Sequence, residues 1–188
     1  MAWLTALDHQ LFFAVHHLQK HHLDWLLAYP TYLGSLCYAL SILFGVILWQ
    51  SRERLLTRTI AAFIPIFFAH WSTEQLKLLF ERSRPFLVFA DKPDAVHVLF
   101  SIPSNFSFPS GHTATAFAVA TVLVHGLRTS PLITYSLAVW IALTRLYVGV
   151  HFPSDTLAGA FWGSMIAFLW VKTLTSWGFG WQKKSSAT

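Results

Sequence analysis

Cysteine and charged residues are both scarce in this chain of 188 residues. Its one cysteine, Cys37, excludes an intrachain disulfide framework and a cysteine-rich zinc site. Charged residues make up only 11% of the sequence, where about 25% is usual in a soluble domain. Such a chain is not disordered, because disorder needs high charge and low hydrophobicity. It also has too few charges to cover the surface of an ordinary water-soluble domain.

Hydrophobic residues make up 55% of the chain, and 17 Phe and 9 Trp are among them. The length suits a single domain over residues 1–188. This composition is typical of a membrane protein, whose partner is the lipid bilayer. In such a protein the placement of Lys and Arg sets the topology. The net charge of +5 is therefore no sign of nucleic-acid binding, and we expect no nucleic acid as a partner.

Apolar runs of roughly 20 residues predict membrane-spanning helices. No strand alternation of barrel type is present, which leaves a helical bundle as the way to satisfy the backbone in lipid. We therefore expect an all-α, polytopic transmembrane bundle of about five to six helices, including an N-terminal interfacial helix over residues 1–20. In that helix leucines recur at three- and four-residue spacing, with Asp8, His9 and His16 between them. The expected spans are 23–49, 59–80, 112–127, 131–147 and 155–174.

Basic residues in the connections predict the orientation of the bundle. If five spans alternate, one side of the membrane carries Arg52, Arg54, Arg58, Arg128, Lys172, Lys183 and Lys184. The other side carries Lys20, Lys92 and a separate group, Lys77, Arg82, Arg84 and Arg145. By the positive-inside tendency the first set is cytoplasmic. The N-terminus and the long connection 81–111 are then expected outside.

Polar residues at the outer ends of the predicted spans form the most informative pattern, because charges beside membrane spans are costly and usually functional. The group comprises Lys77, Arg84, His112, Arg145, His151 and Asp155. Arg84 precedes Pro85, which favours an extended backbone and the end of the helix there. Ser110 can cap the next helix, and Gly111 allows close approach of a ligand to its free N–H groups.

A histidine and a carboxylate lie four residues apart near the start of the last span. Asp155 can accept a ring N–H of His151, which leaves the other ring nitrogen free to attack or to accept a proton. Cations and helix amides nearby would stabilise the oxygens of a transferred phosphoryl group. These residues together predict a phosphate-transfer site.

The same residues form three motifs in order, with correct internal spacing. These are Lys77 with Arg84-Pro85, then Pro109-Ser110-Gly111-His112, then Thr144-Arg145 with His151 and Asp155. They closely resemble the signature K-x6-RP, PSGH and SR-x5-H-x3-D of the type 2 phosphatidic acid phosphatase superfamily. One departure is Thr144, which stands where the family has Ser and keeps the hydroxyl.

The resemblance implies a role for each matching residue. His151 would be the nucleophile that forms a phosphohistidine, Asp155 would orient it, and His112 would protonate the leaving oxygen. Lys77, Arg84, Ser110, Gly111 and Arg145 would hold the phosphate. No metal and no cofactor is implied. The small size and short loops resemble bacterial members of the family, which implies an inner-membrane protein of a bacterium. The distribution of basic residues predicts that its active site faces the extracytoplasmic or periplasmic side.

The substrate class stays open at the level of sequence. Candidates are undecaprenyl diphosphate, phosphatidylglycerol phosphate, phosphatidic acid and the phosphate of lipid A. A lipid-to-lipid phosphotransferase would share the phosphohistidine step. A non-enzymatic anion transporter is the other class, although transporters usually place polar groups at mid-membrane.

Weaker features carry expectations of their own. Glu74 is expected to pair with Lys77, or else to contact substrate, and His70 and His125 are read as bundle histidines. Segment 86–108 is either a lid that selects headgroups or a surface link. Aromatic residues near the ends of the predicted spans are expected to form a belt at the membrane interface, namely Trp25, Trp49 and Tyr147. Four histidines near the N-terminus are expected to face lipid headgroups, with metal binding as the alternative: His16, His17, His21 and His22.

Overall fold

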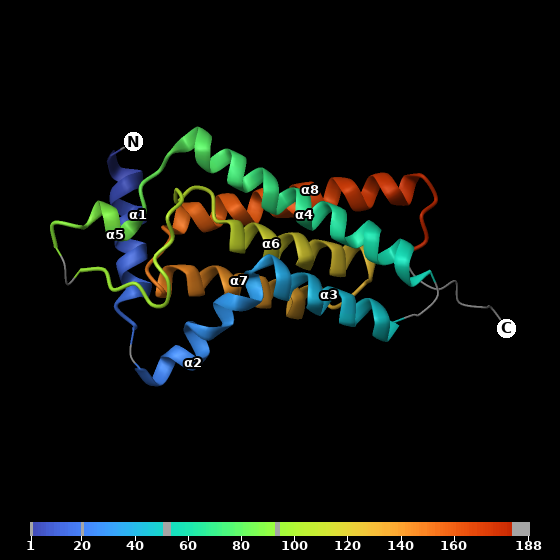
Figure 1. The fold of residues 1–188 in the computed structure, drawn as a ribbon, viewed down its shortest axis with the longest axis horizontal. Coiled ribbons are helices and arrows are strands. Elements are labelled where there is room, and N and C mark those ends of the chain that lie inside the picture. The colour runs from blue at the N-terminus through green and yellow to red at the C-terminus, as the bar shows by residue number, and fades with distance from the viewer. Residues whose placement is uncertain (1, 20, 51–53, 93–94, 182–188) are drawn as a thin grey trace.

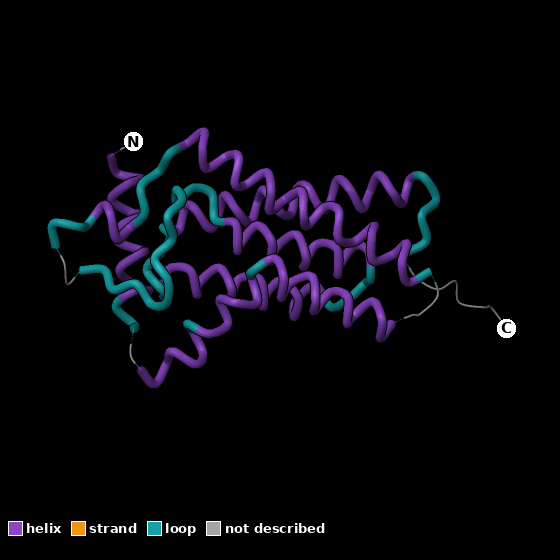
Figure 2. The backbone as a smooth tube through the Cα atoms, in the orientation of Figure 1, coloured by secondary structure: helices purple, strands orange, loops and turns teal. Residues whose placement is uncertain are grey.

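The computed structural model describes residues 2–19, 21–50, 54–92 and 95–181. Within these ranges every regular element is helical, and long helices run side by side while a shorter one crosses one end of them (Figures 1 and 2). The elements are α1 (Ala2–His16), η1 (His21–Leu23), α2 (Asp24–Leu27), η2 (Tyr29–Gly34), α3 (Leu36–Gln50), α4 (Leu55–Phe80), α5 (Pro85–Val88), α6 (Gly111–Thr121), a π-helical turn η3 (Val122–Gly126), α7 (Pro131–Tyr147) and α8 (Pro153–Ser176).

The run 23–49, expected as one helix, is broken in the structure. Short helical turns cover Asp24–Gly34, and α3 then continues at 81° to them. Pro30 and Gly34 both lie in the first part, where they disfavour a continuous helix. The bend keeps residues 29–34 beside the polar end of the bundle instead of extending them along it.

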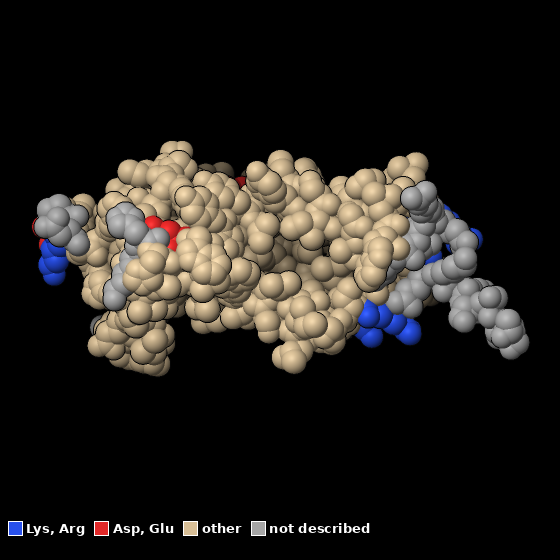
Figure 3. Space-filling model, turned by 90° about the horizontal axis from the view of Figure 1, so that it is seen from below, with Lys and Arg blue, Asp and Glu red and all other residues tan. Residues whose placement is uncertain are grey.

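Among the described residues, two helical stretches are long and apolar enough to cross a membrane, and the bent pair would add a third. They are Leu55–Val88, which includes α4 and α5, and Pro153–Ser176. The helix formed by α6 and η3 is shorter than about 20 residues, and so is α7. Membrane spans at 112–127 and 131–147 therefore stay predictions. In Figure 3 Lys and Arg side chains lie toward the ends of the visible face, and its middle is free of them.

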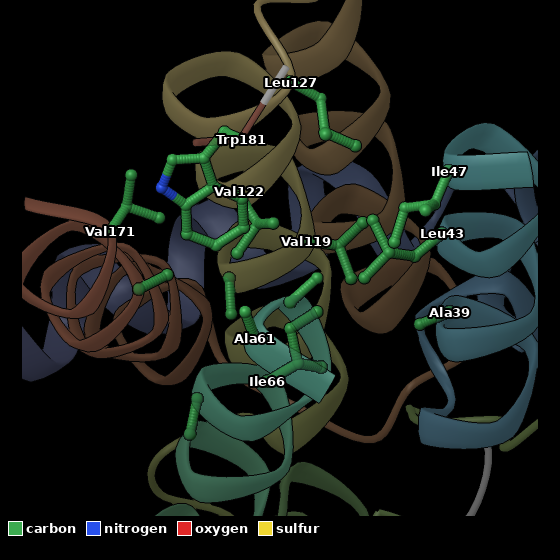
Figure 4. Close-up of a cluster of buried hydrophobic side chains, with 14 residues drawn as sticks. Ala39, Leu43, Ile47, Ala61, Ile66, Val119, Val122, Leu127, Val171 and Trp181 are labelled. Atoms are coloured by element: carbon green, nitrogen blue, oxygen red, sulfur yellow. The ribbon is translucent and has the colours of Figure 1, made fainter. Parts of the chain in front are cut away.

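The apolar core lies where α3, α4, α6 and α8 meet. Leu43 of α3, Ile66 of α4 and Val122 at the end of α6 are fully buried, and Val171 of α8 joins them (Figure 4). Trp181 closes the core after α8 has ended. This core fixes the positions of the helices whose ends build the polar site.

Helices α6 and α8 pack with their backbones unusually close. A Cβ atom added at Gly163 would lie 2.1 Å from the carbonyl oxygen of Ala114, and one added at Gly159 would lie 2.5 Å from that of Ser110. The two glycines are four residues apart, so they share one face of α8. Small residues at this spacing allow helices in membranes to approach closely.

Helix α1 turns its polar residues toward the protein. Asp8, Phe12 and His16 are buried, while Leu4, Leu7 and Leu11 are exposed. Since α1 lies across the end of the bundle, its leucine face points away from the protein core (Figure 1). The polar interruptions of the leucine pattern are therefore contacts with the bundle. That the leucines lie in a membrane interface stays a prediction.

Candidate active site

A cavity of about 550 Å³ opens at the end of the bundle that α1 crosses. α4, α6 and α7 contribute helix ends to it, and the connections before α6 and after α7 complete its wall. Of the residues predicted to act, Lys77, Arg84, Gly111, His112, Arg145 and His151 line this cavity. Ser110 and Asp155 are fully buried beside it.

Arg84 lies just beyond the end of α4. The helix ends at Phe80, the last residue of the expected span 59–80 and four residues before Arg84, because Glu81 takes a left-handed conformation with φ 45°. Arg84 is then extended before Pro85, as the sequence predicts, with φ −79° and ψ 158°. The turn directs Lys77 and Arg84 into the same cavity.

The Arg84 guanidinium is held by backbone and side-chain oxygens. It donates to the Asn105 carbonyl at 2.7 Å, to the Asn105 Oδ1 at 2.6 Å and to the Val150 carbonyl at 2.8 Å. One terminal nitrogen also lies 3.4 Å from Nε2 of His151.

Lys77 is paired with Glu74, as the sequence predicts. Its Nζ lies 2.6 Å from Oε1 of Glu74, and Asn105 donates to the other carboxylate oxygen at 2.9 Å. Glu74 and His70 both line the cavity. The cavity thus contains an acidic group beside its cations.

Arg145 reaches the cavity from the end of α7. Its guanidinium donates to the Thr31 hydroxyl, while its Nε is buried without a partner among the described residues. Thr31 belongs to the turn η2, which lies just before the bend that leads into α3. The neighbouring Thr144 donates to the Ile141 carbonyl at 2.6 Å, so its hydroxyl is engaged within α7.

His151 and Asp155 lie together at the start of α8. Nδ1 of His151 is 3.5 Å from Oδ2 of Asp155, and the same carboxylate oxygen accepts from the Ser107 hydroxyl at 2.5 Å and from the Phe152 amide at 2.8 Å. Since Nδ1 faces these oxygens, Nε2 is the ring nitrogen on the side of Arg84. Burial lowers the pKa of His151 to about 3. The hydrogen bond to Asp155 raises this pKa, but its effect is smaller than that of burial.

The second oxygen of Asp155 belongs to an ionic network that reaches α1. Arg82 donates to Oδ1 of Asp155 at 2.5 Å and to Oδ2 of Asp8 at 2.6 Å. Asp8 also accepts from the amide of Ser154 at 2.8 Å and from its hydroxyl at 2.6 Å. The guanidinium of Arg82 lies 4.5 Å above the Phe152 ring. The carboxylate beside His151 is thereby tied to the N-terminal helix.

The start of α6 carries the predicted Ser-Gly-His turn. Ser110 occupies the N-cap position, but its hydroxyl accepts from Thr113 at 3.1 Å and does not cap the helix. A Cβ atom added at Gly111 would lie 3.3 Å from Oε1 of Glu74. Glycine therefore lets the helix end lie close to that carboxylate.

Several sequence predictions about single residues are wrong. Tyr147 is fully buried and donates to Asp24 at 2.8 Å, so it is no part of an interface belt, whereas Trp25 and Trp49 are exposed. His16 is buried between the Tyr147 carbonyl and the His97 amide, each 3.1 Å away. It therefore faces no headgroup. His125 is exposed against Phe168 and is no interior histidine.

The connection before α6 belongs to the cavity wall. Leu99, Phe100 and Asn105 line the cavity, which favours the lid interpretation of segment 86–108 over a plain surface link. Predictions for Lys20, Arg52, Lys183 and Lys184 lie outside the described residues, and so does the side chain of His21.

Sequence reasoning missed four residues that support the site, namely Asp8, Thr31, Asn105 and Ser107. One signal was present, because Asp8 is a lone acid in an apolar helix. Nothing in the sequence marks Thr31, Asn105 or Ser107, whose role depends on contacts with residues far along the chain.

Comparison with known proteins gives matches to one family. The family model described as PAP2 superfamily matches residues 35–178. An undecaprenyl-diphosphatase of Sulfolobus acidocaldarius is 38% identical over 103 residues, 53% of this chain and 47% of that protein, so the match spans about half its length. The undecaprenyl-diphosphatase BcrC of Bacillus subtilis is 28% identical over 173 residues, 88% of this chain and 83% of that protein. The crystal structure of Aquifex aeolicus LpxE is 31% identical, with a TM-score of 0.71 over 88% of this chain and 95% of that one.

Proposed function

Since the chain belongs to the PAP2 superfamily of membrane phosphatases, we propose that it hydrolyses a lipid phosphate or diphosphate at the extracytoplasmic face through a phosphohistidine. One observation carries the proposal. His151, with Asp155 behind it, meets Lys77, Arg84 and Arg145 around a single cavity. A nucleophile backed by a carboxylate and facing several cations is the arrangement that phosphoryl transfer requires.

His151 is the nucleophile in this mechanism. Asp155 accepts the Nδ1–H, so the lone pair on Nε2 attacks phosphorus and the bond to the leaving oxygen breaks. The low pKa of His151 keeps Nε2 unprotonated before attack. Arg84, Arg145 and Lys77 compensate the charge that spreads over the phosphoryl oxygens.

His112, which lines the same cavity, serves both half-reactions. In the first step it gives a proton to the leaving lipid oxygen. In the second step it takes a proton from the water that attacks the phosphohistidine, which releases phosphate and restores His151. The three cations supply positive charge that a metal would otherwise provide.

The proposed orientation rests on basic residues at the end of the bundle away from the cavity, and the proposed substrate class rests on the matched relatives. Arg54 and Arg58 begin α4, Arg128 precedes α7 and Lys172 is near the end of α8, all at the end away from α1 (Figure 1). By the positive-inside tendency that end is cytoplasmic, in the inner membrane of a bacterium. Two of the matched relatives are undecaprenyl-diphosphatases, and others are a lipid A 1-phosphatase and a phosphatidylglycerophosphatase B. These names support a lipid phosphate or diphosphate as substrate without selecting one of the four candidates, and a polyprenyl diphosphate is the first to test.

Trapping of the phosphoenzyme tests this function. Wild-type protein mixed with labelled polyprenyl diphosphate should carry label at His151 after alkaline gel separation and peptide mapping. His151→Ala should carry none. His112→Ala should turn over slowly with lipid substrate and less slowly with an activated aryl phosphate, whose leaving group needs no proton. Label on His112, or label retained in His151→Ala, would show that the roles are reversed.

A substrate panel separates the remaining alternatives. Purified protein should release inorganic phosphate from at least one of the four lipids, and an excess of chelator should not reduce the rate. Transfer of label to an added acceptor lipid would favour the phosphotransferase. Absence of both reactions would favour the anion transporter.

A further inference from the structure

A second cavity of about 310 Å³ lies at the end of the bundle away from the candidate active site. The start of α4 and the residues at the end of α8 enclose it. Its wall includes Arg54, Thr57, Arg58, Leu174, Trp177 and Phe179. None of these residues takes part in the proposed reaction.

Arg58 is the unusual member of this wall. Its side chain belongs to a residue only 5% exposed, yet its Nε has no hydrogen-bond partner. No acidic side chain among the described residues forms an ion pair with it. A buried cation loses its hydration and needs an anion or a set of acceptors in return. The cavity beside Arg58 is where such an anion fits.

The start of α4 adds to the positive potential of the same cavity. This helix has 26 residues, and the amides of its first turn have no acceptor within the helix. Arg54 and Thr57 stand on that first turn and face the cavity. A helix N-terminus together with an unpaired buried arginine is a suitable site for phosphate.

We propose that this cavity binds the phosphate of an anionic membrane lipid. The walls favour a lipid over free phosphate, because Leu174, Trp177 and Phe179 are apolar and lie beside the arginines. Trp177 is 80% exposed, as expected for a tryptophan at the boundary of a bilayer. The site depends on the membrane placement of the chain and not on the catalytic proposal.

Hydrogen exchange of the delipidated full-length protein tests the site without any variant. Dioleoylphosphatidylglycerol should slow amide exchange in residues 54–58 and 174–181 by at least about tenfold. Dioleoylphosphatidylcholine and inorganic phosphate should not. Protection by inorganic phosphate alone would overturn the choice of a lipid, and equal protection by both lipids, or by neither, would overturn the anion site.

Two arginine variants then assign the contact. Arg58→Gln should weaken phosphatidylglycerol binding by about tenfold in native mass spectrometry, because it removes the charge that faces the cavity. Arg128→Gln removes the same charge from an exposed position at the same end and should change binding less than twofold. Phosphate release should be unchanged in Arg58→Gln, which separates this proposal from the catalytic one. Equal weakening in both variants would overturn it.

Discussion

Arg82 holds two acidic side chains from opposite ends of the chain, Asp8 and Asp155. Asp155 is fully buried and each of its oxygens accepts at least one hydrogen bond, so its position is fixed before substrate arrives. Fixing the carboxylate fixes the ring of His151, whose Nδ1 faces it. Arg82 and Asp8 are thus positioning residues for the proposed nucleophile.

Substitution of Arg82 tests this positioning. Arg82→Gln should lower kcat by about 10²-fold with little change in KM, because misplacement of a reacting group costs rate more than binding. Arg82→Lys should be intermediate, since an ammonium cannot span both carboxylates in the same way. Single-turnover formation of the phosphoenzyme is the measurement.

A double-variant cycle gives the control for Arg82. Asp8→Asn should reduce kcat less than Arg82→Gln does, and the double variant should be no slower than Arg82→Gln alone. Additive losses in kcat would mean that Asp8 and Arg82 act separately, which contradicts the network.

The low pKa of His151 predicts a pH dependence of stability. The unfolded chain binds a proton at this residue near pH 6.5, whereas the folded chain does so only near pH 3. Stability is therefore lost as pH falls from 6.5 toward 3, by roughly 2 kcal/mol between pH 7 and pH 5. The free energy of unfolding in detergent, measured across this range, should show a flatter slope for His151→Asn than for wild type.

At the scale of helices, the close contact between α6 and α8, here called the seam, leaves no room for larger side chains at Gly159 and Gly163. Gly163→Ala should destabilise the protein by about 1–3 kcal/mol, because its methyl group meets the backbone oxygen of Ala114. Gly45→Ala on α3 is the matched control, since a Cβ atom there meets nothing within 4 Å. That control should be neutral or slightly stabilising in a helix. Equal unfolding midpoints for the two variants would contradict the tight seam.

The sequence was a good guide to the helices and to the polar residues that line the cavity, and a poor guide to contacts between distant segments. Apolar runs predicted helices where α4, α7 and α8 occur, because the length of such a run is a local property. The break near Gly34 was missed, since a bend in an apolar run depends on what packs against it. Tyr147 and His16 were misplaced for a related reason. Their polar atoms are satisfied by Asp24, Tyr147 and His97, which no periodicity brings together.

At the scale of the whole molecule, the two ends of the bundle should face different compartments. With Cys37→Ala as the background, Asp91→Cys near the candidate site should react with an impermeant thiol reagent in intact cells. Arg128→Cys at the other end should react only after the membrane is opened. The reverse pattern would place the active site in the cytoplasm and defeat the extracytoplasmic proposal.

The bond between Asp8 and the amide of Ser154 joins residues 146 positions apart. During synthesis, α1 leaves the ribosome long before Ser154 is made, and His151 and Asp155 are among the last residues of the candidate site to appear. A nascent chain with every helix but α8 therefore has Lys77, Arg84 and Arg145 without the carboxylate that faces His151. Under the proposed mechanism, a chain that ends before α8 is expected to release no phosphate from lipids.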